Sequence, residues 1–117
     1  MAKRAADDPD YLAAYTFLDM IWRKEGDGDL AALLGSMQID EGDGRPFDSA
    51  FFGDWNLCRA RVRQSPDAGY ETLILFLEEK SVTWSSESNY LPDLVDRMRG
   101  AERDDMHALW ETAKAQD

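Results

Sequence analysis

The sequence predicts an all-α protein, a single-domain bundle of five to six helices. Apolar residues recur at intervals of three and four nearly throughout the chain, no run alternates with a period of two, and β-branched residues are scarce. A length of 117 residues with 44% hydrophobic residues suffices for one packed core. We therefore expect one helical domain over residues 1–117, with frayed ends at 1–7 and 114–117.

Two helices are predicted in the first third of the chain. Asp7 or Asp8 is the expected cap of the first helix, and Pro9 suits its first turn. Gly26 ends this helix, and Asp29 is the expected cap of the second. The residues expected to face the core are Tyr11, Leu12, Tyr15, Leu18 and Trp22 in the first helix, and Leu30, Leu33, Leu34 and Met37 in the second.

Three or four further helices follow a predicted loop at residues 39–47, which holds two glycines and a proline. Asp48 is the expected cap of the third helix, and residues 65–67 separate it from the fourth. Residues 81–88 are rich in serine and predict a second loop, after which Asn89 is the expected cap of a fifth helix. The expected core residues of these helices are Phe51, Phe52, Trp55, Cys58 and Val62, then Tyr70, Leu73, Ile74 and Leu77, then Leu91, Leu94, Val95 and Met98, and finally Met106, Leu109, Trp110 and Ala113. Arg59, Arg61 and Arg63 are expected in the last turns of the third helix, where cations favour the helix dipole.

The chain also contains a candidate internal duplication. The apolar pattern of residues 30–37 recurs at 91–98, an offset of 61 residues, and the same offset relates Leu12 to Leu73 and Tyr15 to Phe76 without a gap. Such spacing is also generic for amphipathic helices, so both interpretations stay open. A genuine repeat would predict two helix pairs that pack around a pseudo-twofold axis.

Acidic residues dominate the charge of the chain, which is −11 at neutral pH. The segment from Glu25 to Asp54, which we call the acidic segment, holds eight carboxylates and one base, Arg45. This composition argues against nucleic acid or an anionic membrane as partner and favours a protein with a basic surface, although acidity also serves solubility. The predicted helices divide the acidic segment into loops at 27–29 and 40–48, roughly 16–18 Å apart across one short helix.

No residue pattern supports catalysis or a cofactor. Cys58 is the single cysteine, and we expect a buried, inert thiol. His107, the single histidine, shares a helix face with Asp104 and Glu111, which is metal-ligand spacing, but an exposed, salt-bridging histidine is the favoured interpretation. Residues 40–44 lack the side-chain ligands that a calcium loop requires. The sequence therefore predicts a protein that is not an enzyme and has neither metal nor cofactor.

Two aromatic residues in predicted loops are candidate anchors for a partner. Trp22, Trp55 and Trp110 lie on apolar stripes and are expected in the core, whereas Trp84 lies in a polar loop and Phe47 lies off the apolar stripe. Tryptophan is enriched among interface residues that dominate binding energy, although Trp84 could equally fold back over the helix ends. The predicted partner-binding residues are Asp27, Asp29, Asp40, Glu41, Asp43, Phe47, Asp48 and Trp84.

Residues 17–22, 28–37, 48–50 and 54–55 resemble segments of small helical bacterial proteins from toxin–immunity neighbourhoods, including contact-dependent growth inhibition immunity proteins. The resemblance covers residues 11–60 and transfers no catalytic residues. It implies a stoichiometric binder that blocks a cognate toxin, often a basic nuclease.

Two hypotheses of function follow. The first is a cytoplasmic protein–protein interaction module of the immunity type, whose acidic loops dock on a basic toxin. The second is a structural or regulatory helical homodimer whose acidity serves solubility only. A cytoplasmic location is expected, because the sequence shows neither an N-terminal signal pattern nor an apolar run long enough to span a membrane.

Overall fold

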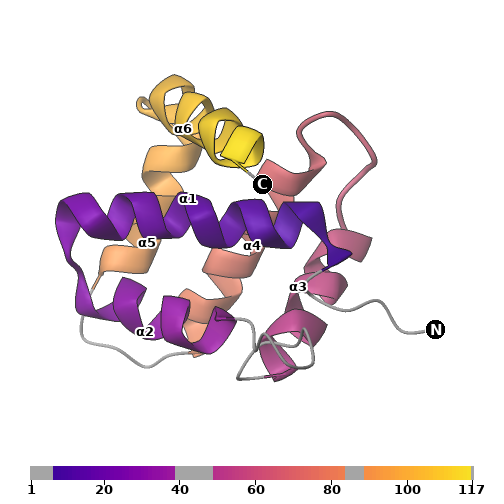
Figure 1. Cartoon of the computed structure of the whole chain (residues 1–117), viewed down its shortest axis with the longest axis horizontal. Coiled ribbons are helices and arrows are strands. Elements are labelled where there is room, and N and C mark those ends of the chain that lie inside the picture. The colour runs from indigo at the N-terminus through magenta and orange to yellow at the C-terminus, as the bar shows by residue number, and fades with distance from the viewer. Residues whose placement is uncertain (1–6, 39–48, 84–88, 117) are drawn as a thin grey trace.

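The all-α prediction is confirmed by a computed structural model that describes residues 7–38, 49–83 and 89–116 (Figure 1). Six helices and no strand are present in these ranges. None of the described helices is long and apolar enough to cross a membrane. The helices are α1 (Pro9–Glu25), α2 (Gly28–Met37), α3 (Ser49–Ala60), α4 (Ala68–Thr83), α5 (Tyr90–Arg99) and α6 (Arg103–Gln116).

The first two helices each begin at an aspartate cap, and α1 ends at a glycine. The Asp8 carboxylate accepts hydrogen bonds from the amides of Asp10 and Tyr11 at 3.0 and 3.2 Å, which satisfies amides that have no partner within α1. Gly26 ends α1 in the left-handed conformation, with φ of 65°, where a side chain would be strained. The cap of α2 is Asp27, not Asp29 as predicted, because the Asp27 carboxylate accepts from the Leu30 amide at 3.1 Å.

Several helix ends differ from the sequence prediction. α3 ends at Ala60, so Arg61 and Arg63 lie in the connector to α4 rather than in a last helical turn. α4 continues to Thr83, three residues into the predicted serine-rich loop. Asn89 stands at the start of α5 but makes no capping hydrogen bond with its side chain. α6 is helical through Gln116, whereas the sequence predicted fraying from residue 114.

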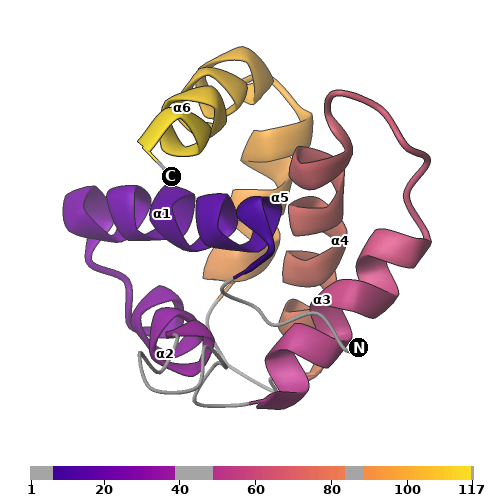
Figure 2. The same cartoon turned by 45° about the vertical axis from the view of Figure 1, so that its right-hand side comes forward.

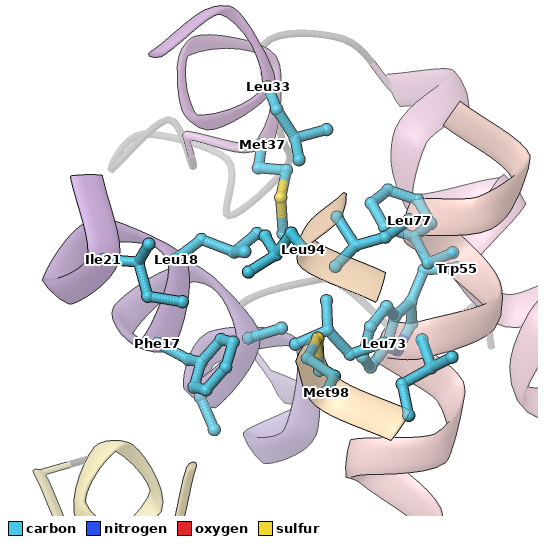
Figure 3. Packing of buried hydrophobic residues seen from close by; sticks show 14 of the residues in the cluster. Phe17, Leu18, Ile21, Leu33, Met37, Trp55, Leu73, Leu77, Leu94 and Met98 are labelled. Carbon is cyan, nitrogen blue, oxygen red and sulfur yellow. The ribbon is translucent and has the colours of Figure 1, made fainter. Parts of the chain in front are cut away.

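All six helices contribute to one apolar core (Figure 3). Trp55 and Trp110 are both buried, as predicted. The core-facing predictions for α2 and α5 are confirmed in full, since all of their predicted stripe residues are buried. In α6, Leu109 is only partly buried. The close view shows residues of α1, α2, α4 and α5 converging on the centre, among them Leu18, Met37, Leu73, Leu94 and Met98.

Trp22 contradicts its predicted place in the core, because 39% of its surface is exposed. The buried stripe of α1 runs through Tyr11, Ala14, Leu18 and Ile21. Trp22 follows Ile21 directly, which turns its side chain about 100° around the helix, to the edge of that stripe. Trp22 was predicted to be buried because it lies four residues after Leu18, but Ile21, three residues after Leu18, is the one that faces the core.

The six helices form two similar halves, α1–α3 and α4–α6 (Figure 2). α1 packs on α2, α4 and α6, while α4 packs on α5, α1 and α3. α2 also packs on α3 and α5, and α5 on α6. Exchanging α1 with α4, α2 with α5 and α3 with α6 converts each of these contacts into another of them, or leaves it unchanged as for α1 with α4 and α2 with α5. The helix contacts therefore have the symmetry that a pseudo-twofold axis between the two halves would produce.

Aromatic contacts in the core follow the same symmetry. Trp55 of α3 packs edge-on against Tyr11 and Phe76, with ring centroids 5.6 and 5.8 Å apart. Trp110 of α6 packs edge-on against Tyr70 and Phe17, at 6.2 and 6.0 Å. Each tryptophan thus contacts a tyrosine at the start of one long helix and a phenylalanine of the other. An offset of 59 residues relates Tyr11 to Tyr70 and Phe17 to Phe76.

Each half is closed by the same hydrogen bond. The Tyr11 hydroxyl donates to the carbonyl of Met37 at 3.3 Å, and the Tyr70 hydroxyl donates to that of Met98 at 2.8 Å. Met37 is the last residue of α2 and Met98 is the last but one of α5, and the two methionines are 61 residues apart. The quasi-repeat is therefore present in the structure, but with an offset of 59 in the long helices. The gapless offset of 61 holds only for the short helices, because the connector before α5 is longer.

Candidate protein-interaction site

Most of the predicted interaction residues lie outside the described ranges. The structure places Asp27 and Asp29 at the start of α2. The remaining predicted residues, Asp40, Glu41, Asp43, Phe47, Asp48 and Trp84, fall in residues 39–48 and 84–88. Candidate contact surfaces are therefore those that the described helices form.

Three of the four described carboxylates of the acidic segment hold the fold together. Asp27 caps α2, as shown above. Glu25 accepts two hydrogen bonds from the Arg97 guanidinium, both at 3.0 Å, and one from the Tyr90 hydroxyl at 2.5 Å. These contacts join the end of α1 to α5. The Arg97 hydrogen bond, aided by that of Tyr90, lowers the pKa of Glu25, so its negative charge is committed to this contact.

Asp54 is the partner of a buried cation. The Lys80 side chain is only 5% exposed and donates a hydrogen bond from Nζ to the Asp54 carboxylate. The same ammonium lies 4.2 Å from the ring centre of Phe51 and 5.3 Å from that of Phe76. Cation–π attraction and the carboxylate together offset the loss of hydration. The acidic segment thus offers a partner less free charge than its composition suggests.

A hollow beside Trp22 is the clearest candidate contact surface of the first half. It has a volume of about 230 Å³ and lies between α1 and α2. Tyr15, Asp19 and Trp22 line it from α1, one turn after another, and Leu34 and Gln38 line it from the end of α2. We call it the tryptophan hollow. Its rim at Gln38 is followed directly in the chain by residues 39–48, which contain four of the predicted acidic interaction residues.

A second hollow, of about 360 Å³, lies over the outer face of α4. Ile74 and Leu75 form its apolar part, and three arginines line it: Arg61 from the α3–α4 connector, Arg99 from the end of α5 and Arg103 from the start of α6. We call it the arginine hollow. Sequence reasoning missed it, because its cations come from three separate segments and no local spacing brings them together.

Cys58 is buried, as predicted, and its thiol donates a hydrogen bond to the Glu79 carboxylate at 3.4 Å. Burial, together with the hydrogen bond to Glu79 and the charge of its carboxylate, raises the pKa of the Cys58 thiol to about 11. The thiolate, which is the nucleophilic form, is therefore scarce at neutral pH. This environment gives Cys58 the properties of a packing residue.

His107 contacts a carboxylate that the sequence did not indicate, that of Asp67. Its Nε2 lies 2.8 Å from Oδ1 of Asp67 and 3.7 Å from Oε1 of Glu111, while its ring packs edge-on against Tyr70 at 5.2 Å. A contact between His107 and carboxylates is present as predicted, but the side chain is only 30% exposed, so it is less exposed than predicted. Asp67, from the turn before α4, takes the place that spacing assigned to Asp104.

The Asp67, His107 and Glu111 side chains also form the one cluster of candidate metal ligands among the described residues, with one ligand atom of each within 4.8 Å of the others. One nitrogen and two oxygens would suit a divalent cation. The same geometry is satisfied by a hydrogen bond that ties the start of α4 to α6. Cys58 of α3 contacts Glu79 and His107 of α6 contacts Asp67, and the described contacts include none between the thiol and the imidazole.

The described residues define a small all-α fold whose surface includes the tryptophan hollow and the arginine hollow. No family model, no curated protein and no solved structure matches the chain. Function must therefore be argued from the surfaces themselves.

Proposed function

We propose that the chain is a non-catalytic, cytoplasmic protein–protein interaction module, most specifically an immunity-type protein that binds and neutralises a basic cognate toxin. The observation that carries this proposal is the exposed Trp22 at the tryptophan hollow. A tryptophan that is 39% exposed leaves a large apolar surface in water, and such residues are enriched among interface hot spots.

Charge supports the choice of partner. The chain carries a net charge of −11, and residues 39–48, which follow Gln38 directly in the sequence, hold four carboxylates and one arginine. A basic partner would be drawn to the chain by long-range attraction, which raises the association rate and favours it over acidic competitors. Affinity would come mainly from Trp22 and the apolar lining of the hollow.

A binding measurement with matched variants tests this proposal. The chain is immobilised, its partner is captured from the native host, and the affinity of the purified partner is then measured by surface plasmon resonance. We expect Trp22→Ala to weaken binding by at least about tenfold, the effect of a hot-spot residue. Leu57→Ala is the control, because Leu57 is 67% exposed on α3 and does not line the tryptophan hollow.

Equal affinity of Trp22→Ala and wild type for the captured partner would contradict the role of the tryptophan hollow. A stable homodimer in analytical ultracentrifugation, without any captured partner, would favour the alternative of a structural or regulatory homodimer. Circular dichroism of both variants confirms that the helical fold is retained in the comparison.

A further inference from the structure

The arginine hollow is a basic site in a strongly acidic chain. Three of the residues that line it are arginines, and Glu71 is the one acid among them. The protein as a whole carries almost two acidic residues for each basic one. Charge at this place is therefore opposite in sign to the charge of the molecule.

Two of the three guanidinium groups have no acidic partner within the described part of the chain. Arg99 pairs with Glu78 on α4. Arg61, in contrast, makes no ion pair with a described residue, and the same holds for Arg103. Arg103 is held in place by the face of Tyr70, with its guanidinium carbon 5.2 Å from the ring centre. A guanidinium without an ion-pair partner among the described residues is a ready donor for an oxyanion.

Comparison of the two halves shows which lining residues are particular to the arginine hollow. The long-helix offset of 59 relates Tyr15 and Asp19 of the tryptophan hollow to Ile74 and Glu78 beside the arginine hollow. The short-helix offset of 61 relates Gln38 to Arg99. The two hollows thus share two corresponding lining positions, Tyr15 with Ile74 and Gln38 with Arg99. Arg61 and Arg103 have no counterpart among the residues that line the tryptophan hollow, so these cations are particular to the arginine hollow.

Size and lining define the kind of ligand. A volume of about 360 Å³ falls within the range of small-molecule sites. Val62, Ile74 and Leu75 give the hollow an apolar part beneath the arginines. We propose that the arginine hollow binds a small organic oxyanion, a ligand with a carboxylate or phosphate group on an apolar body. The oxyanion pairs with Arg61 and Arg103, and the apolar body lies against α4.

The proposal is tested by nuclear magnetic resonance titration of the isotope-labelled full chain in low-salt buffer. The probes are phenyl phosphate and benzoate, with benzyl alcohol as the neutral analogue of similar shape. We expect saturable shifts at Arg61, Leu75, Arg99 and Arg103 with a dissociation constant on the order of 1 mM, and none with benzyl alcohol. Either anion as the tighter ligand supports the proposal, and the order of the two identifies the oxyanion as phosphate or carboxylate.

Matched variants separate a site from general charge attraction. Arg61→Gln and Arg103→Gln should each weaken the better anion by about tenfold, and Glu71→Gln should tighten it. Arg63→Gln is the control, because it removes the same charge from the same connector but does not line the hollow. Equal effects of Arg61→Gln and Arg63→Gln, or no saturable shift up to about 20 mM of either anion, would overturn the proposal.

Discussion

The buried contact between Lys80 and Asp54 gives the sharpest test of the structure. Removing the carboxylate with Asp54→Asn leaves the Lys80 ammonium without a counterion in a place where its side chain is 5% exposed. Breaking a fully buried ion pair from one side costs about 3–5 kcal/mol. Asp54 itself is 29% exposed, and asparagine retains one acceptor oxygen, so we expect a loss of about 2–3 kcal/mol. A small domain has only about 5–15 kcal/mol of stability, so this loss is easily measured.

The opposite change should be nearly harmless. Lys80→Met keeps the length of the side chain and removes the buried charge, and the Asp54 carboxylate that it leaves without a partner is 29% exposed and can be hydrated. The corresponding position in the other half is already apolar, because the offset of 59 relates Lys80 to Ile21, which is buried in α1. We expect Lys80→Met to change the free energy of unfolding by less than about 1 kcal/mol.

Urea denaturation followed by circular dichroism provides the assay for this cycle. Once Lys80 is methionine, Asp54→Asn should cost little, so the two substitutions should show a coupling energy of about 1.5–2.5 kcal/mol. A loss below about 0.5 kcal/mol for Asp54→Asn in the wild-type background would refute the reasoning, because it would mean that Lys80 has no need of its partner.

Three further predictions follow from other contacts. Tyr11→Phe and Tyr70→Phe should each reduce the free energy of unfolding in urea by about 1–2 kcal/mol, since each leaves a buried carbonyl without its donor, and very unequal losses would argue against the pseudo-twofold axis. The pKa of the Cys58 thiol is about 11 in the folded chain and lower in the unfolded chain, so its burial favours folding fully at neutral pH and progressively less as pH rises toward 11. Stability should therefore fall between about pH 8.5 and pH 11, and Cys58→Ala should make that fall less steep; an unchanged slope would contradict the assignment. Elemental analysis of purified protein should find no stoichiometric divalent metal, because the 2.8 Å contact of His107 with Asp67 is explained by a hydrogen bond, and one bound ion per chain would contradict this.

The helices were predictable because their signals are local. Asp8, Pro9 and Gly26 mark the ends of α1 by chemistry that depends only on the neighbouring amides and on φ. The apolar stripes of α2 and α5 repeat with the helical period, and every member predicted to be buried is buried. Local periodicity therefore sufficed for the fold class and for most of the core.

The surfaces were less predictable because they depend on residues that are distant in the sequence. Burial of Lys80 depends on Asp54 and the rings of Phe51 and Phe76, and nothing in the composition of α4 indicates it. Trp22 satisfied the spacing rule and still lies at the surface, because it is one residue, or about 100° around the helix, beyond the buried Ile21. Net charge likewise overstated the free acidic surface, since Glu25 is committed to α5.

The salt dependence of partner association tests the central proposal most directly. The association rate of the chain with its purified partner is measured from low to high ionic strength, for wild type and for Trp22→Ala. We expect the rate to fall steeply as salt shortens the range of attraction to about 10 Å or less, while Trp22→Ala mainly speeds dissociation. An association rate that stays flat across this range would contradict an interaction module guided by its acidic face.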